Sequence, residues 1–127
     1  MEKQKGKKIL IINDSPTLNA LLELTLEAEG FSVTVAETGL SGLKKAGKEE
    51  FNLILLDYLL PDINGLEVCR KLREKEVTKD TPIAFVSGTD KDEILKKIKK
   101  VGGDAYIDPP LTGEIFIDKI NDLINRN

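Results

Sequence analysis

The chain has 127 residues, of which 40% are hydrophobic and 32% are charged. These values are typical of one soluble domain that can bury a core of its own. The formal net charge of -3 gives no general attraction for nucleic acid or for an anionic membrane. No apolar run approaches the length of a membrane span, so we expect a cytoplasmic protein that binds neither nucleic acid nor membrane.

The first strand is predicted close to the start of the chain. Residues 1–7 form a charged tail, and residues 8–127 are expected to form the domain. Lys8 to Ile12 is a short apolar run that stops at Asn13 and Asp14. The run predicts a buried strand that ends in oxygen-bearing side chains.

A helix is predicted directly after this strand. Ser15 is a good N-cap, and Pro16 suits the first helical position. Apolar residues then recur at helical spacing until Gly30, which predicts a broad apolar face that lies on a sheet. The residues of this face are Leu18, Leu21, Leu22, Leu24, Leu26 and Ala28.

The next two elements are predicted to be weaker. Residues 31–36 alternate between apolar and polar side chains, which indicates a strand nearer the edge of the sheet. A second helix is predicted over 38–50. Gly42 and Gly47 should weaken it, because each costs about 1 kcal/mol relative to alanine.

The strand predicted at 52–57 is the central one. Leu53 to Leu56 are four consecutive apolar residues, which is typical of a parallel strand covered on both faces, and Asp57 ends the run. A helix is predicted from about 65 to 76. The single cysteine of the chain, Cys69, lies on it and is interpreted as a packed side chain rather than a reactive thiol.

The last third of the chain repeats the alternation. A fourth strand at 82–86 ends at Ser87, and the helix after it carries lysines between Lys96 and Lys100, which we interpret as a solvated face rather than a docking patch. A fifth strand at 104–107 leads through a stiff turn to a last helix, for which Thr112 is the predicted N-cap.

Five strands that alternate with five helices predict an α/β fold. We expect a doubly wound, five-stranded parallel sheet of flavodoxin-like order 2-1-3-4-5, with helices on both faces. In that order the first and third strands are neighbours, so Asn13, Asp14 and Asp57 should converge at the carboxyl ends of the strands.

These oxygen groups suit a hard cation and a phosphoryl group. Mg2+ takes carboxylate, carbonyl and water oxygens, and one or two carboxylates with a phosphate are enough to hold it. Asp14 and Asp57 can supply them. A carboxylate beside Mg2+ can also attack a phosphoryl group, and Ser87 can donate a hydrogen bond to a phosphoryl oxygen.

Taken together, the landmarks of the chain resemble the receiver domain of two-component response regulators over residues 7–125. The matching residues are Asn13 and Asp14, Asp57 with Pro61 and Gly65, Ser87 after Val86, and Tyr106 before Pro110. By this resemblance Asp57 is the phospho-acceptor, and Ser87 and Tyr106 are the switch residues that respond to the phosphoryl group. The implied ligands of Mg2+ are Asp14, Asp57, Asn13 and the backbone carbonyl of Leu59.

The resemblance also implies partners. A histidine kinase or a phosphotransfer protein would supply the phosphoryl group, because the chain has no histidine of its own. A downstream protein would bind the face made by the fourth helix, the fifth strand and the fifth helix. Formation of a homodimer is left open as a further alternative. The chain would be a switch rather than an enzyme, with weak self-phosphorylation and dephosphorylation at most.

Two positions depart from the family pattern. Asn13 stands where a second acidic residue is usual, which should weaken metal binding. Pro109 stands where the family has a lysine, and loss of one preorganised donor commonly lowers a rate by about 10²-fold to 10³-fold. The alternative function is therefore a pseudo-receiver, an interaction module that works without phosphorylation. A flavin or nucleotide binder is disfavoured, because the turn at 13–17 lacks a glycine-rich phosphate cradle.

Overall fold

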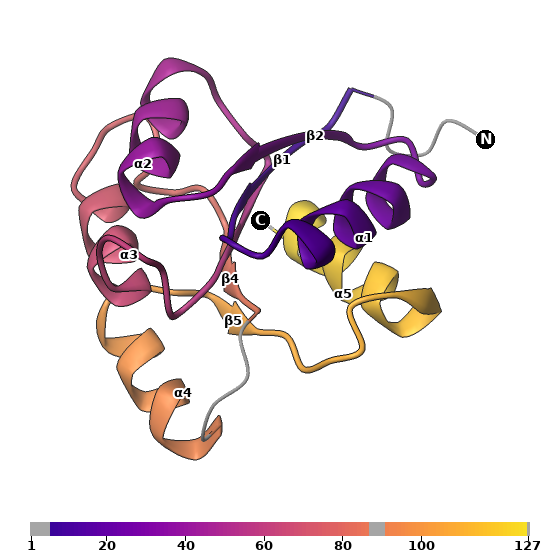
Figure 1. Cartoon of the computed structure of the whole chain (residues 1–127). Coiled ribbons are helices and arrows are strands. Elements are labelled where there is room, and N and C mark those ends of the chain that lie inside the picture. Colours follow the sequence, from indigo (N-terminus) through magenta and orange to yellow (C-terminus); the bar gives the residue numbers. More distant parts are fainter. Residues whose placement is uncertain (1–5, 87–90, 127) are drawn as a thin grey trace.

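The structure, a computed structural model, describes residues 6–86 and 91–126. Five parallel strands form one sheet in the order β2-β1-β3-β4-β5. Figure 1 shows α1 and α5 on one face of this sheet and α2, α3 and α4 on the other. The fold class predicted from the sequence is confirmed, with the predicted strand order.

Every predicted strand and helix is present, and the bounds differ by a few residues. The strands are β1 (Lys8–Ile12), β2 (Ser32–Ala36), β3 (Leu53–Leu56), β4 (Ile83–Phe85) and β5 (Ala105–Tyr106). The helices are α1 (Pro16–Glu27), α2 (Gly39–Lys48), α3 (Gly65–Arg73), α4 (Lys91–Lys100) and α5 (Gly113–Asn125).

The core lies in two layers, one on each face of the sheet. Alternate strand residues point to opposite faces, so Ile9 and Ile11 of β1 pack with α1 and α5, whereas Leu10 and Ile12 pack with α2, α3 and α4. All four residues of β3 are fully buried, as expected for the central strand. The edge strand β2 is only partly buried, which also agrees with its sequence pattern.

The apolar face of α1 is narrower than its sequence indicates. The buried residues of the helix are Asn19, Leu22 and Leu26. Leu24 is 72% exposed, Leu21 is 43% exposed and Ala28 is also exposed, so the prediction that these three residues lie on the sheet is wrong. A helix contacts a sheet along one stripe at three- and four-residue spacing, and Leu24 lies on the opposite side from Leu22.

The helix starts follow the predicted capping residues in part. The Ser15 hydroxyl accepts a hydrogen bond from the Leu18 backbone N–H at 3.2 Å, as expected of an N-cap. Thr112 occupies the N-cap position of α5, but its side chain makes no capping hydrogen bond. None of the helices in residues 6–86 and 91–126 is long and apolar enough to cross a bilayer.

Cys69 is packed inside the layer of α2, α3 and α4. Its side chain is buried, and its Sγ lies 3.5 Å from the Val101 carbonyl oxygen. Burial raises the pKa of the Cys69 thiol to about 11. The thiol is therefore protonated at neutral pH, which agrees with its interpretation as a packed side chain.

Candidate functional site

The carboxyl ends of the strands bring polar side chains to the α1 and α5 face of the sheet. Asn13 continues the alternation of Ile9 and Ile11, and Asp57 continues that of Leu53 and Leu55. The ladder extends into these residues, because the Asp57 backbone N–H donates to the Ile12 carbonyl at 2.9 Å. The two side chains therefore leave the sheet on the same face, from neighbouring strands.

A hollow of about 400 Å³ lies beyond these strand ends. Its lining residues are Asn13, Asp14, Ser15, Leu18, Leu21, Asp57, Val86, Pro109 and Leu111. The structure thus places Asn13, Asp14 and Asp57 around one hollow, whereas Ser87, the predicted hydroxyl donor, lies outside the described residues. Asn13 is 3% exposed and Asp57 is 7% exposed, while Asp14 is open to solvent.

Two other predicted site residues do not line the hollow. The Leu59 backbone N–H donates to Asp57 Oδ1 at 3.2 Å, so this residue lies beside the predicted acceptor while its side chain is 59% exposed. Tyr106 is partly buried and packs on the opposite face of the sheet, against the core under α2, α3 and α4.

The loop that follows Asp57 folds back tightly onto the end of β3. The Gly65 backbone N–H donates to the Tyr58 carbonyl at 2.9 Å. A Cβ atom at Gly65 would lie 2.2 Å from the Asp57 carbonyl oxygen, far inside van der Waals contact. Only glycine lets the start of α3 approach the backbone of Asp57 this closely.

The same loop is held to α2 by Asp62. Its carboxylate accepts hydrogen bonds from the backbone N–H groups of Gly39 at 2.8 Å and Leu40 at 2.9 Å. These hydrogen bonds lower the pKa of Asp62, and the bond from Leu40 has the largest effect. Gly39 also packs closely on Ile63, because a Cβ atom there would lie 2.6 Å from Ile63 Cγ1. The role of Asp62 was not predicted, since its partners lie 22 and 23 residues earlier in the chain.

Two buried amides, those of Asn13 and Asn19, are hydrogen-bonded to each other beside the hollow. Asn13 Nδ2 donates to Asn19 Oδ1 at 3.0 Å, and Asn19 Nδ2 donates to the Asn13 carbonyl oxygen at 2.8 Å. Asn19 was missed as a site residue, although one signal was present: a polar residue on the same helical stripe as Leu22 and Leu26. A buried amide requires partners, and Asn19 finds them in Asn13, directly after β1.

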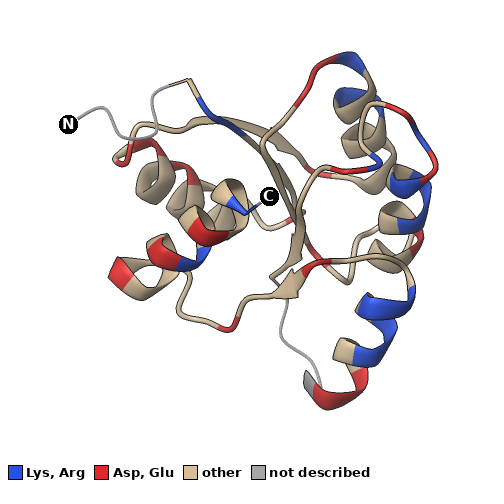
Figure 2. Ribbon diagram, turned by 180° about the vertical axis from the view of Figure 1, so that it is seen from behind, with Lys and Arg blue, Asp and Glu red and all other residues tan. Residues whose placement is uncertain are grey.

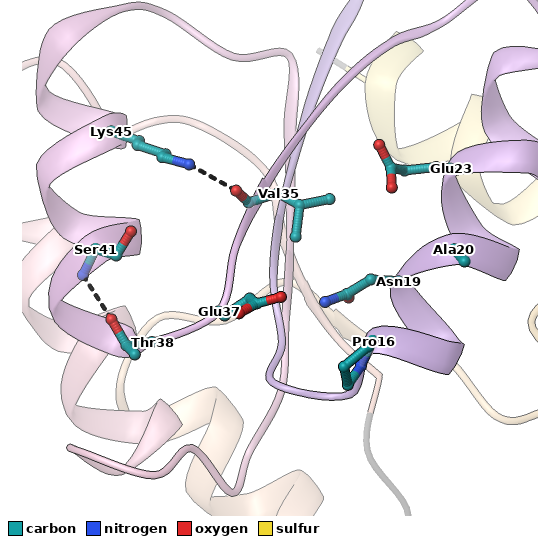
Figure 3. A pocket seen from close by; sticks show the side chains of 9 residues that line it. All are labelled: Pro16, Asn19, Ala20, Glu23, Val35, Glu37, Thr38, Ser41 and Lys45. Atoms are coloured by element: carbon teal, nitrogen blue, oxygen red, sulfur yellow. Dashed lines mark hydrogen bonds between the residues drawn. The ribbon is translucent and has the colours of Figure 1, made fainter.

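Asn19 also borders a second hollow, of about 500 Å³, over the edge strand between α1 and α2. Figure 3 shows its side chain extending from α1 toward the strands, with Glu37 facing it. On the far wall Lys45 Nζ donates to the Val35 carbonyl oxygen at 2.7 Å. The lysine thus covers a carbonyl of the edge strand that would otherwise be open to another chain.

The donor set around Asp57 fits a hard cation. Within the described parts of the chain, no group of three or more His, Cys, Asp and Glu side chains could hold a metal ion. The hollow instead offers two carboxylates, Asp14 and Asp57, together with the amide of Asn13. Mg2+ retains several waters and needs no more protein ligands than this, so the residues present fit Mg2+ better than a metal that requires a closed cage.

Pro109, which stands where the resemblance implies a lysine, lies in the wall of the hollow. No lysine or arginine is found among the residues that line the hollow in the described chain. Basic residues are frequent instead on α2, α3 and α4, whereas the charged residues of α1 and α5 are mainly acidic (Figure 2). On α4 the lysines from Lys96 to Lys100 are exposed, and Lys97 pairs with Glu93 at 3.3 Å.

Comparison with known proteins gives consistent similarities. A family model described as "Response regulator receiver domain" matches residues 9–121. The response regulator ArlR of Staphylococcus saprophyticus is 38% identical over 121 residues, which are 94% of this chain and 53% of that protein. The chain therefore spans about half the length of the curated relatives it matches.

Solved structures share the whole fold. The chemotaxis protein CheY4 of Vibrio cholerae has a TM-score of 0.87 at 26% identity and covers 92% of this chain and 98% of its own. The receiver domain of the sensor histidine kinase PA1611 from Pseudomonas aeruginosa has a TM-score of 0.84 at 23% identity, with coverage of 94% and 98%. That domain carries a magnesium ion coordinated in its active site cleft.

Proposed function

Because the chain belongs to the response regulator receiver domain family, we propose that it is a phospho-accepting switch with Asp57 as the acceptor. One observation carries the proposal: Asp57 ends the buried central strand and opens into the hollow that Asp14 also lines. An oxygen of the Asp57 carboxylate would attack the phosphorus of a phosphohistidine on a partner. The P–N bond breaks, its electron pair returns to the imidazole nitrogen, and an acyl phosphate forms on Asp57.

A divalent cation would bind in the same hollow as the phosphoryl group. Asp14 and Asp57 are the proposed carboxylate ligands, the Leu59 carbonyl is a proposed backbone ligand, and Asn13 would bind through its amide oxygen or a bound water. When bound, Mg2+ supplies positive charge to the oxygens of the transferring group. Asp14 is open to solvent, which leaves an entry route for the ion.

We further propose that the phosphoryl group is read on the face made by α4, β5 and α5. Ser87, which follows Val86 in the sequence, would donate to a phosphoryl oxygen, and Tyr106 would move further inward in response. A histidine kinase or phosphotransfer protein is the proposed donor, since the chain has no histidine. A downstream protein is the proposed partner of this face, and the exposed lysines of α4 remain assigned to the solvated side of the helix.

The acceptor can be tested with a small phosphodonor. We would incubate the protein with Mg2+ and acetyl phosphate and measure the intact mass. The expected result is a gain of one phosphoryl group that is absent in Asp57→Asn and retained in Asp80→Asn, an exposed aspartate outside the hollow. If no donor concentration produced the gain, the chain would act without phosphorylation, as a pseudo-receiver.

A further inference from the structure

Asn13, directly after β1, is hydrogen-bonded to a residue on α1. Asn13 and Asn19 are 3% and 4% exposed, and they are joined by the two hydrogen bonds described above. We propose that Asn19 is a positioning residue that requires a hydrogen-bond donor at position 13 and thereby gives the proposed metal site a neutral amide in place of a third carboxylate. This inference rests on the proposed function of the hollow.

The requirement for a donor follows from a backbone carbonyl. The Asn13 carbonyl oxygen can only accept, and Asn19 Nδ2 donates to it at 2.8 Å. The orientation of the Asn19 amide is therefore fixed, and its Oδ1 must face the side chain of residue 13. Since Oδ1 can only accept, residue 13 must donate, and Asn13 Nδ2 does so at 3.0 Å.

An ionised aspartate at position 13 would not satisfy this arrangement. Its carboxylate has no proton to donate, so an oxygen would face Asn19 Oδ1 in a buried place where repulsion is weakly screened. Asparagine avoids this conflict and uses its nitrogen on Asn19. Its remaining polar atom, Oδ1, is then the atom that Asn13 can offer to the hollow that it lines.

A double-mutant cycle without metal tests the coupling. We would measure urea unfolding of the wild-type protein, Asn13→Asp, Asn19→Ala and the double variant. Asn13→Asp should raise the unfolding equilibrium constant about tenfold when Asn19 is present, and clearly less when it is alanine. Repulsion from Asp14 and Asp57 acts in both backgrounds, so the cycle removes it. Equal effects in the two backgrounds would overturn the proposal.

Asn52→Asp is the matched control. Asn52 is exposed, and its Oδ1 accepts from the Lys8 backbone N–H at 2.7 Å, a role that a carboxylate keeps. If Asn13→Asp did not fold, Asn13→Ser and Asn13→Ala would give the same comparison, because serine retains a donor. Serine should then be more stable than alanine with Asn19 present, and a lack of that difference would count against a donor requirement.

The affinity for Mg2+ is a second measurement, which would not depend on residue 19 in this way if Asn19 served only the stability of the fold. Titration of Mg2+ by calorimetry, without a phosphodonor, should show that Asn13→Asp increases affinity several-fold more in the Asn19→Ala background than with Asn19 present. An identical gain in both backgrounds would refute the positioning role. Neither measurement involves phosphorylation of Asp57, so failure of the proposed acceptor and failure of this inference are distinguishable.

Discussion

Because Gly65 lies so close to the backbone of Asp57 and Tyr58, we expect that adding a single methyl group there destabilises the protein. In Gly65→Ala the new Cβ would lie 2.2 Å from the Asp57 carbonyl oxygen and 2.9 Å from the Tyr58 Cα. Both neighbours are backbone atoms, so the start of α3 must move. Overpacking of this kind costs about 1–3 kcal/mol, and alanine in a helix returns at most about 1 kcal/mol.

We therefore expect Gly65→Ala to lower the free energy of unfolding by about 1–2 kcal/mol. With a urea m-value of about 1–3 kcal/mol/M, the midpoint of unfolding should fall by roughly 1 M. Labelling by acetyl phosphate should also slow, because the displaced backbone carries the Asp57 side chain. Urea unfolding followed by circular dichroism measures the first effect, and intact mass against time measures the second.

Gly47→Ala is the control for this prediction. Gly47 is exposed on α2, and no atom lies within 4 Å of a Cβ built there. Alanine should therefore stabilise the protein, by up to about 1 kcal/mol. A Gly65→Ala variant as stable as the wild-type protein, beside a stabilised Gly47→Ala, would refute the argument from backbone contact.

Three further predictions follow from single residues. Pro109→Lys should accelerate labelling by acetyl phosphate by about 10²-fold, because it adds a cationic donor in the wall of the hollow; an unchanged rate would contradict this reasoning. Asp62→Ala should lower the melting temperature more than Asp62→Asn, which keeps one acceptor for Gly39 or Leu40. The folded-state pKa of Asp62 is lowered, so its contribution to stability is fully present above the unfolded pKa of about 4. That contribution is lost as the pH falls from there through the folded-state pKa. The melting temperatures of the variants and the wild-type protein should therefore converge in acid. Cys69 should react with a thiol reagent at pH 8 far more slowly in the native protein than in urea, because it is buried and its pKa is about 11; equal rates would contradict its buried state.

The sequence predicted the sheet well because its strands carry strong local signals. Leu53 to Leu56 cannot form a strand with one wet face, and the shorter run at Lys8–Ile12 ends at polar residues in the same way. Alternation of strands with helices then allows few topologies, since crossovers are right-handed. The positions of Asn13 and Asp57 at one edge followed from that topology alone.

The interactions that shape the hollow were harder to predict. Asp62 accepts from α2, and Asn19 accepts from Asn13, but nothing local in the sequence relates these partners. The burial of α1 was also misjudged, because leucine at seven-tenths exposure looks the same in a sequence as leucine in a core. In α1 leucines occur on more than one side of the helix, so leucine positions alone do not identify the buried stripe. The buried stripe is identified only if Asn19 is included in it with Leu22 and Leu26.

The two departures from the family pattern cancel in net charge but not in position. Asn13 removes a negative charge from the buried end of β1, whereas Pro109 removes a positive charge from the exposed rim of the hollow. A phosphoryl group brings about -1.5 to -2 charges at neutral pH, and the described lining residues include no lysine or arginine to meet them. A divalent cation between Asp14 and Asp57 would then be the main neutralising charge. Phosphorylation of Asp57 should consequently depend on the Mg2+ concentration more steeply in the wild-type protein than in Pro109→Lys, where the lysine supplies part of that charge from the protein itself.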